Sequence, residues 1–88
     1  MTRRYRDPVE MLELRPDQRA GSAPARFRWR GRTHLVTEIL GYWREDAAYW
    51  AGGGIDVPQR DLWRVATSGR LCELVHEAGE WHLCRVWD

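Results

Sequence analysis

The 88-residue chain carries fourteen basic and thirteen acidic residues and has a formal net charge of +1. Leu, Ile, Val and Phe fill only 17 positions, but six Trp and three Tyr add enough apolar area to favour one folded domain, residues 1–88, over a disordered chain. No apolar run approaches the ~20 residues of a membrane span, and the Arg-rich start lacks a signal peptide's apolar stretch. We therefore expect a soluble, cytoplasmic protein with no membrane partner.

The first predicted element is an edge strand over residues 4–14, where apolar positions follow an imperfect period of two. Pro8 has no N–H to donate, so we place it at the start of the strand or on its outer side. Residues 15–24 contain two Pro and a Gly-Ser pair and predict a flexible loop.

The clearest strand signal lies in residues 25–32. Phe27 and Trp29 fall on one face of the extended chain, and the arginines that alternate with them fall on the other. Gly31 predicts a turn, after which the β-branched residues of segment 33–40 complete a hairpin.

The middle of the chain is rich in aromatic residues and glycine. A Tyr-Trp pair at 42–43 recurs at 49–50, and residues 44–50 have room for at most one short helical turn. Residues 52–60 begin with three consecutive Gly and predict a second flexible loop.

Three further strands are predicted at 62–67, 71–76 and 81–87, with turns at Ser68-Gly69 and Ala78-Gly79. Short strands at regular spacing, with Gly at the turns, are typical of small barrels. The sequence therefore predicts an all-β domain, a small antiparallel barrel-like meander of five to six strands of the SH3 or OB type.

The order of the aromatic residues resembles a known family. The residues that carry the resemblance are Phe27-Arg28-Trp29-Arg30-Gly31-Arg32, Gly41-Tyr42-Trp43, Trp50, Leu62-Trp63-Arg64-Val65 and the ending GEWHLCRVWD at 79–88. They resemble an uncharacterised family of small actinobacterial proteins and the C-terminal segment of ImuB-type proteins, the polymerase-like hubs of a translesion-synthesis cassette. The resemblance implies an accessory module linked to bacterial DNA repair, and it supplies no catalytic residues.

A row of arginines is the first candidate binding feature. Arg26, Arg28, Arg30 and Arg32 recur every ~6.6 Å along the predicted strand, a spacing that could track a phosphate backbone. The alternative is that the row pairs with Glu10 or Glu13 across the sheet and protects an edge from aggregation.

The aromatic residues divide into two groups. Trp29, Trp63 and Trp81 are expected in the core, with each indole N–H bonded to a carbonyl. Aromatic residues outside the strand centres are candidate anchors for a partner. They are Tyr42, Trp43, Tyr49, Trp50 and Trp87.

Cys72, His76, His82 and Cys84 resemble a zinc ligand set, but the first two would lie ~13 Å apart along one strand, too far for tetrahedral coordination. We therefore expect no metal, no cofactor and no catalytic residues. The favoured function is a non-catalytic module that binds a protein partner, within the DNA-repair assembly that the resemblance implies. The alternative is weakly sequence-selective binding of single-stranded nucleic acid along the arginine row.

Overall fold

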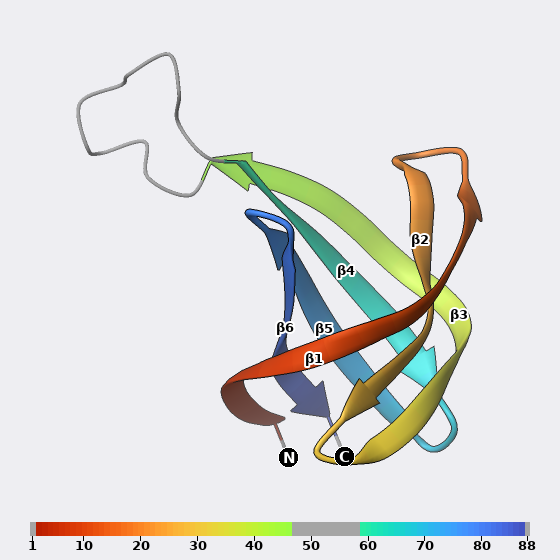
Figure 1. Ribbon diagram of the computed structural model, residues 1–88, viewed down its shortest axis with the longest axis vertical. Helices are drawn as coiled ribbons and strands as arrows, with labels where there is room; N and C mark the ends of the chain where they lie inside the picture. The colour runs from red at the N-terminus through yellow and green to blue at the C-terminus, as the bar shows by residue number, and fades with distance from the viewer. Residues whose placement is uncertain (1, 47–58, 88) are drawn as a thin grey trace.

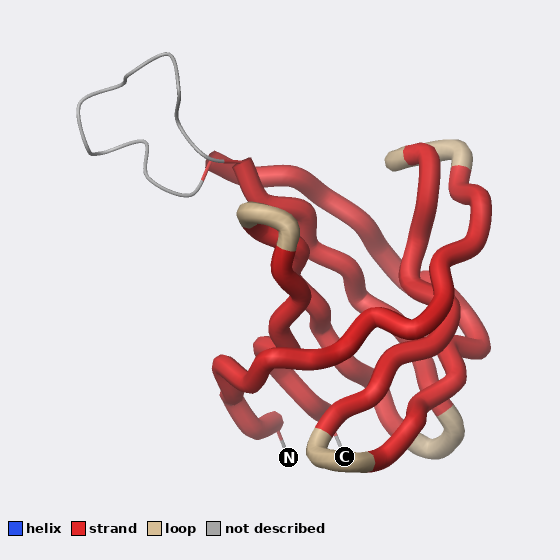
Figure 2. Tube along the Cα trace, viewed as in Figure 1, coloured by secondary structure: helices blue, strands red, loops and turns tan. Residues whose placement is uncertain are grey.

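A computed structural model of the chain describes residues 2–46 and 59–87, and every regular element in these ranges is a β-strand (Figures 1 and 2). The strands are β1 (Thr2–Asp17), β2 (Gly21–Trp29), β3 (Arg32–Asp46), β4 (Gln59–Thr67), β5 (Arg70–Glu77) and β6 (Glu80–Trp87). Consecutive strands pair in antiparallel fashion and β1 also pairs with β6, which closes a barrel. The predicted all-β barrel is confirmed, with six strands in the described ranges. These ranges contain no helix long and apolar enough to cross a membrane.

Two strands change partners along their length and thereby join two sheets. Residues 2–9 of β1 pair with β6, whereas residues 10–17 pair with β2. Similarly, residues 32–35 of β3 pair with β2 and residues 36–46 pair with β4. The register shifts in both strands, as at a β-bulge, and such irregularities bend a strand and increase its twist. Bending allows the sheet to curl until its first and last strands meet.

Each half of β1 thus has one hydrogen-bonded neighbour, as an edge strand would, but the two neighbours are different strands. Pro8 lies within the strand, opposite His82, and only Val9 separates it from the exchange of partners. Pro8 is exposed, so of the two expected positions the structure has the one on the outer side and not the one at the strand start.

The predicted hairpin turns are all present. Arg30 and Gly31 both have positive φ, 52° and 76°, as do Ala78 and Gly79, 54° and 79°. Two positive φ values are typical of the type I′ turn, whose twist matches that of antiparallel strands. These glycines therefore set the register of the strands that they join.

Strands β2 to β6 each contribute buried side chains to the core of the barrel. The side chains of β1 that pack against this core are only partly buried. Trp63 and Phe27 are its largest fully buried side chains, and Trp29 is 6% exposed. Trp81 is only partly buried but packs against the same cluster. The buried cluster comprises Ala23, Phe27, Trp29, Val36, Trp63, Val65, Cys72, Leu74, Leu83 and Val86.

The expected flexible loop at residues 15–24 is wrong for most of its length. Residues 15–17 belong to β1 and residues 21–24 to β2, so only Gln18–Ala20 form a turn. Asp17 stabilises this turn by accepting hydrogen bonds from the backbone N–H groups of Arg19 and Ala20. The segment is ordered because Ala23 and Pro24 are buried, which its composition does not suggest.

Two other expectations fall largely outside the described residues. Of the segment 44–50, residues 44–46 are strand and the rest lie outside the described ranges. Of the expected loop 52–60, residues 59 and 60 begin β4, and the remainder likewise lies outside.

Candidate functional site

The arginine row on β2 has the orientation that its sequence predicts. Phe27 is fully buried and Trp29 nearly so, while the side chains of Arg26 and Arg28 are about half exposed. Arg30 differs from its neighbours, because it lies in the turn that follows β2 rather than in the strand.

Two arginines of this row are paired with glutamates on β1. Arg26 lies 2.8 Å from a carboxylate oxygen of Glu13, and Arg28 lies 3.5 Å from one of Glu10. In each case the two residues are direct register partners. Exposed pairs of this kind add only ~0–1 kcal/mol to stability, but they place a negative charge beside each guanidinium. The outer face of β2 is therefore much less cationic than the row suggests.

Arg30 belongs to a separate cluster with Asp7, Trp29 and Tyr5. The Nε of Arg30 and the indole Nε1 of Trp29 both donate to Asp7 Oδ2, each at 3.0 Å. The guanidinium carbon of Arg30 lies 4.9 Å from the ring centroid of Tyr5 and 5.0 Å from that of Trp29, within the range of cation–π contacts. The indole N–H thus reaches a carboxylate, rather than the expected carbonyl.

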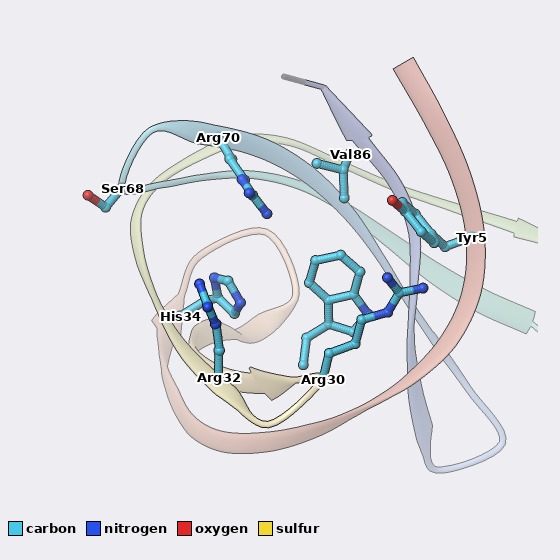
Figure 3. A pocket seen from close by; sticks show the side chains of 8 residues that line it. Tyr5, Arg30, Arg32, His34, Ser68, Arg70 and Val86 are labelled. Atoms are coloured by element: carbon cyan, nitrogen blue, oxygen red, sulfur yellow. The ribbon is translucent and has the colours of Figure 1, made fainter. Parts of the chain in front are cut away.

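A cavity of about 480 Å³ opens at one end of the barrel, the end that carries the β2–β3 and β4–β5 turns (Figure 1). We call it the barrel mouth, and its lining is Tyr5, Trp29, Arg30, Arg32, His34, Ser68, Arg70 and Val86. Figure 3 shows Arg70 extending into the opening from one side, with Arg32 and His34 on the other. The described lining contributes three guanidinium groups, of which that of Arg30 is paired with Asp7.

His34 lies within the barrel mouth among aromatic rings. Its imidazole stacks on Phe27, with centroids 5.2 Å apart, and is tilted against Trp29 at 6.0 Å. Burial, and then the charges of Arg70 and Arg32, lower the pKa of His34 below its ordinary value of 6.5. Its Nε2 is buried, and within the described structure this atom has no hydrogen-bond partner.

A second hollow, of about 430 Å³, is lined by residues from β1 and β3–β6. We call it the lateral groove, and its lining is Tyr5, Trp43, Arg60, Leu62, Arg64, Glu73, Val75, Cys84 and Arg85. Arg64 is its central cation: its guanidinium carbon lies 5.6 Å from the ring centroid of Trp43 and 5.1 Å from that of Trp87. Glu73, only 6% exposed, lies 3.5 Å from Arg64.

Tyr42 lies apart from Trp43, its neighbour in sequence. It packs against Trp63 with ring centroids 4.2 Å apart, and its hydroxyl donates to Asp61 at 2.9 Å. Burial and this hydrogen bond raise the pKa of Tyr42. Burial alone would raise the pKa of Asp61, but hydrogen bonds from Arg44 and Tyr42 outweigh it and leave that pKa below its usual value. The ring and hydroxyl of Tyr42 are therefore engaged within the barrel, and this residue is a poorer candidate than Trp43 for contact with a partner.

The predicted site residues do not form one surface. Arg26 and Arg28 lie on β2, Arg30 and Arg32 reach the barrel mouth, and Trp43 lies in the lateral groove. Tyr49 and Trp50 lie outside the described residues. Sequence reasoning missed Arg64, Arg70 and His34. A signal was available for Arg32 and Arg70, since each directly follows a predicted turn, and alternate turns of a meander lie at the same end.

The cysteines and the histidines near them do not assemble into a ligand cluster. His76 stacks on Trp81 with centroids 4.4 Å apart, and Cys72 is buried in the core. Burial is the main cause that raises the pKa of the Cys84 thiol. In residues 2–46 and 59–87, no group of three or more His, Cys, Asp or Glu side chains could hold a metal ion.

Comparison with protein families gives a match along the entire chain. Residues 1–88 match the family described as Domain of unknown function (DUF6504). The chain belongs to this family. The comparisons with curated proteins and with solved structures gave no match. The resemblance in the aromatic residues implies membership in an uncharacterised domain family, and the match agrees with it. What the DUF6504 domain binds is therefore inferred from its own side chains.

Proposed function

We propose that this DUF6504 domain is a non-catalytic interaction module that binds an acidic segment of a protein partner in the lateral groove. The observation that carries the proposal is the contact of Arg64 with both Trp43 and Trp87, two tryptophans that are only partly buried. Trp and Arg are the residue types most enriched among the energetic centres of protein interfaces.

The shape of the groove supports this role. Leu62 and Val75, 7% and 4% exposed, provide an apolar floor, and Trp43 and Arg64 stand beside it. A side chain of the partner that covers this floor would exclude water from the cation–π contacts, which become stronger as they are desolvated. An apolar centre with a polar rim is the usual anatomy of an interface.

Charge indicates the chemistry of the partner. Three arginines line the groove in the described structure, Arg60, Arg64 and Arg85, against one acidic residue, Glu73. Glu73 faces Arg64, and Arg85 adds a second cation to the same rim, so an incoming segment meets a net positive charge. Guanidinium groups bind carboxylates with paired hydrogen bonds, and complementary charge also speeds association.

The cellular setting of the proposal comes from the resemblance to the C-terminal segment of ImuB-type proteins. It favours a partner in a translesion-synthesis or other DNA-repair assembly of the actinobacterial cytoplasm. On this proposal the domain supplies a contact surface, and the chemistry of repair belongs to its partners.

Binding of single-stranded nucleic acid along β2 has less support. Arg26 and Arg28 each face a glutamate, so a phosphate backbone on this face would have to compete with two carboxylates. Such binding would weaken steeply with salt, in proportion to the phosphates neutralised. An Arg26→Glu/Arg28→Glu variant that loses salt-sensitive binding of an oligonucleotide would favour it over the groove.

The test compares Trp43→Ala with Leu35→Ala. Leu35 is 58% exposed and does not line the groove, so its substitution is a matched control. Partners captured from a GC-rich bacterial host, with and without DNA damage, are purified and titrated against each variant. We expect Trp43→Ala to weaken binding about tenfold or more while Leu35→Ala leaves it unchanged. If Trp43→Ala folds, as judged by its NMR spectrum, and binds every partner normally, the proposal is wrong.

A further inference from the structure

The barrel mouth shares Tyr5 with the lateral groove but contains none of Trp43, Arg64 and Trp87, the residues that carry the proposed function. Two arginines converge there from two turns, Arg32 from the β2–β3 hairpin and Arg70 from the β4–β5 hairpin. Arg30 also lines the mouth, but its guanidinium is held by Asp7 beside Tyr5 (Figure 3). From this convergence we infer that the barrel mouth binds a phosphate monoester dianion, of the kind carried by a nucleotide or by the 5′ end of a nucleic-acid strand. This inference does not depend on the groove or its partner.

The identity of the cations favours phosphate. A guanidinium group offers donors in a planar fork that matches two oxygens of a phosphate or carboxylate group. Arg32 and Arg70 approach the opening from opposite sides, so a tetrahedral anion between them could accept hydrogen bonds from both (Figure 3). The terminal phosphate of a monoester carries about two charges near neutral pH, whereas each internal phosphodiester carries one. Arg30 is already paired with Asp7 at 3.0 Å, so the charge that an anion would meet comes chiefly from Arg32 and Arg70. Two guanidinium groups on opposite sides of the opening favour the dianionic monoester over a singly charged phosphodiester.

The size of the cavity indicates that the phosphate is attached to something larger. Its volume of about 480 Å³ lies in the range of pockets for small organic ligands. Tyr5 and Ser68 also line it and provide an aromatic edge and a hydroxyl beside the cations. A nucleoside portion could occupy this remaining space.

His34 supplies an independent indication of a missing ligand. Its buried Nε2 has no partner in the described structure, and an unsatisfied buried polar atom costs free energy. The charged and titratable groups around it are Arg32 on its own strand, Arg70 on β5, Arg30 in the turn and Tyr5 on β1. An anion among these cations would offset the charges of Arg32 and Arg70, which help to lower the pKa of His34. His34 could then take up a proton and donate it in a hydrogen bond.

The experiment titrates the wild-type domain with inorganic phosphate, thymidine monophosphate, and an oligothymidylate bearing either a 5′-phosphate or a 5′-hydroxyl. The imidazole resonances of His34, followed by NMR, report binding at the barrel mouth. We expect the phosphorylated probes to bind and to shift these resonances. Tighter binding of the phosphorylated oligonucleotide than of the mononucleotide would identify the strand end as the source of the phosphate, and the reverse order would identify a free nucleotide.

Two double variants test the site. Arg32→Gln/Arg70→Gln removes two cations of the mouth, whereas Arg26→Gln/Arg28→Gln removes two exposed cations from β2. We expect about a tenfold or greater loss of affinity in the first and less than about a twofold change in the second. Equal losses would mean general charge attraction, and no binding by the wild type would also overturn the inference. It fails as well if the 5′-hydroxyl oligonucleotide binds as tightly as its phosphorylated form. If Arg32→Gln/Arg70→Gln still binds the protein partner of the lateral groove, a negative result at the barrel mouth leaves the proposed function standing.

Discussion

Trp29 and Asp7 lie 22 positions apart in the chain and are joined by a 3.0 Å hydrogen bond from the indole Nε1 to the carboxylate Oδ2. The same oxygen accepts from Arg30, so one carboxylate fixes a core tryptophan and a cation of the barrel mouth together. The contact ties β1 to the end of β2 beyond the last paired residues of their ladder, Glu10 and Arg28.

Substitutions of Asp7 test how much these hydrogen bonds contribute to stability. We expect Asp7→Ala to lower the free energy of unfolding by ~1–3 kcal/mol, because it leaves the largely buried Trp29 N–H without its acceptor. Asp7→Asn should cost less, since its amide oxygen can still accept. Glu10→Ala, which removes an exposed ion pair, is the control and should change stability by less than ~0.5 kcal/mol. Urea denaturation measures all three, and equal effects for Asp7→Ala and Glu10→Ala would contradict the assignment.

The pKa of His34 predicts how stability depends on pH. Since burial and the charges of Arg70 and Arg32 lower this pKa in the folded state, the unfolded chain binds the proton more readily. The contribution of neutral His34 to the free energy of unfolding is therefore fully present above about pH 6.5, the pKa of histidine in the unfolded chain. It is lost as the pH falls through the lower pKa that His34 has in the folded state. Urea midpoints at about pH 7.5 and about pH 5.5 should differ more for the wild type than for His34→Gln. An unchanged difference in the variant would show that other groups cause the dependence.

The buried carboxylate of Glu73 predicts a non-additive effect in the lateral groove. Arg64→Met keeps apolar contact with the tryptophans but removes the charge that faces Glu73, and we expect a loss of ~1–3 kcal/mol. Adding Glu73→Gln removes the unpaired charge, so the double variant should lose less than the sum of the single losses. Thermal or urea unfolding of the four proteins completes the cycle. Additive losses would mean that the 3.5 Å contact contributes no coupling.

The β5–β6 turn offers a stabilising substitution. Ala78 has a φ of 54°, a left-handed conformation that asparagine adopts more readily than alanine. We expect Ala78→Asn to raise the free energy of unfolding by ~0.5–1 kcal/mol. Ser68, in the β4–β5 turn, does not have a positive φ, so Ser68→Asn is the control and should give no such gain. A lower melting temperature for Ala78→Asn than for the wild type would contradict this prediction.

The features that sequence predicted well are local ones. Alternation of Phe27 and Trp29 with arginines fixes which side chains are buried, because a strand has a period of two residues. Glycine at positions 31, 69 and 79 fixes the turns, because these positions have positive φ. Neither inference needs knowledge of distant neighbours.

The features that sequence missed depend on such neighbours. Ala23 and Pro24 have weak strand propensity, so the segment looked like a loop. They are nevertheless buried: both pair with β1, and Ala23 belongs to the core cluster. Tyr42 looked like a free anchor because its bond to Asp61 crosses from β3 to β4 and depends on the register. The meander places the β2–β3 and β4–β5 turns at the same end, but the closure of the sheet is what brings residues of β1 and β6 into one cavity with them.

The pairing of residues 2–9 with β6 also constrains the order in which the molecule is assembled. The β4–β5 and β5–β6 hairpins connect neighbouring segments and can form early, whereas the seam between the first and last strands joins segments separated by most of the sequence. Contacts of such long range impose a large loop-closure entropy and slow folding. During synthesis the N-terminal strand must wait for Glu80–Trp87 to emerge, and until then part of its backbone is available to other strands.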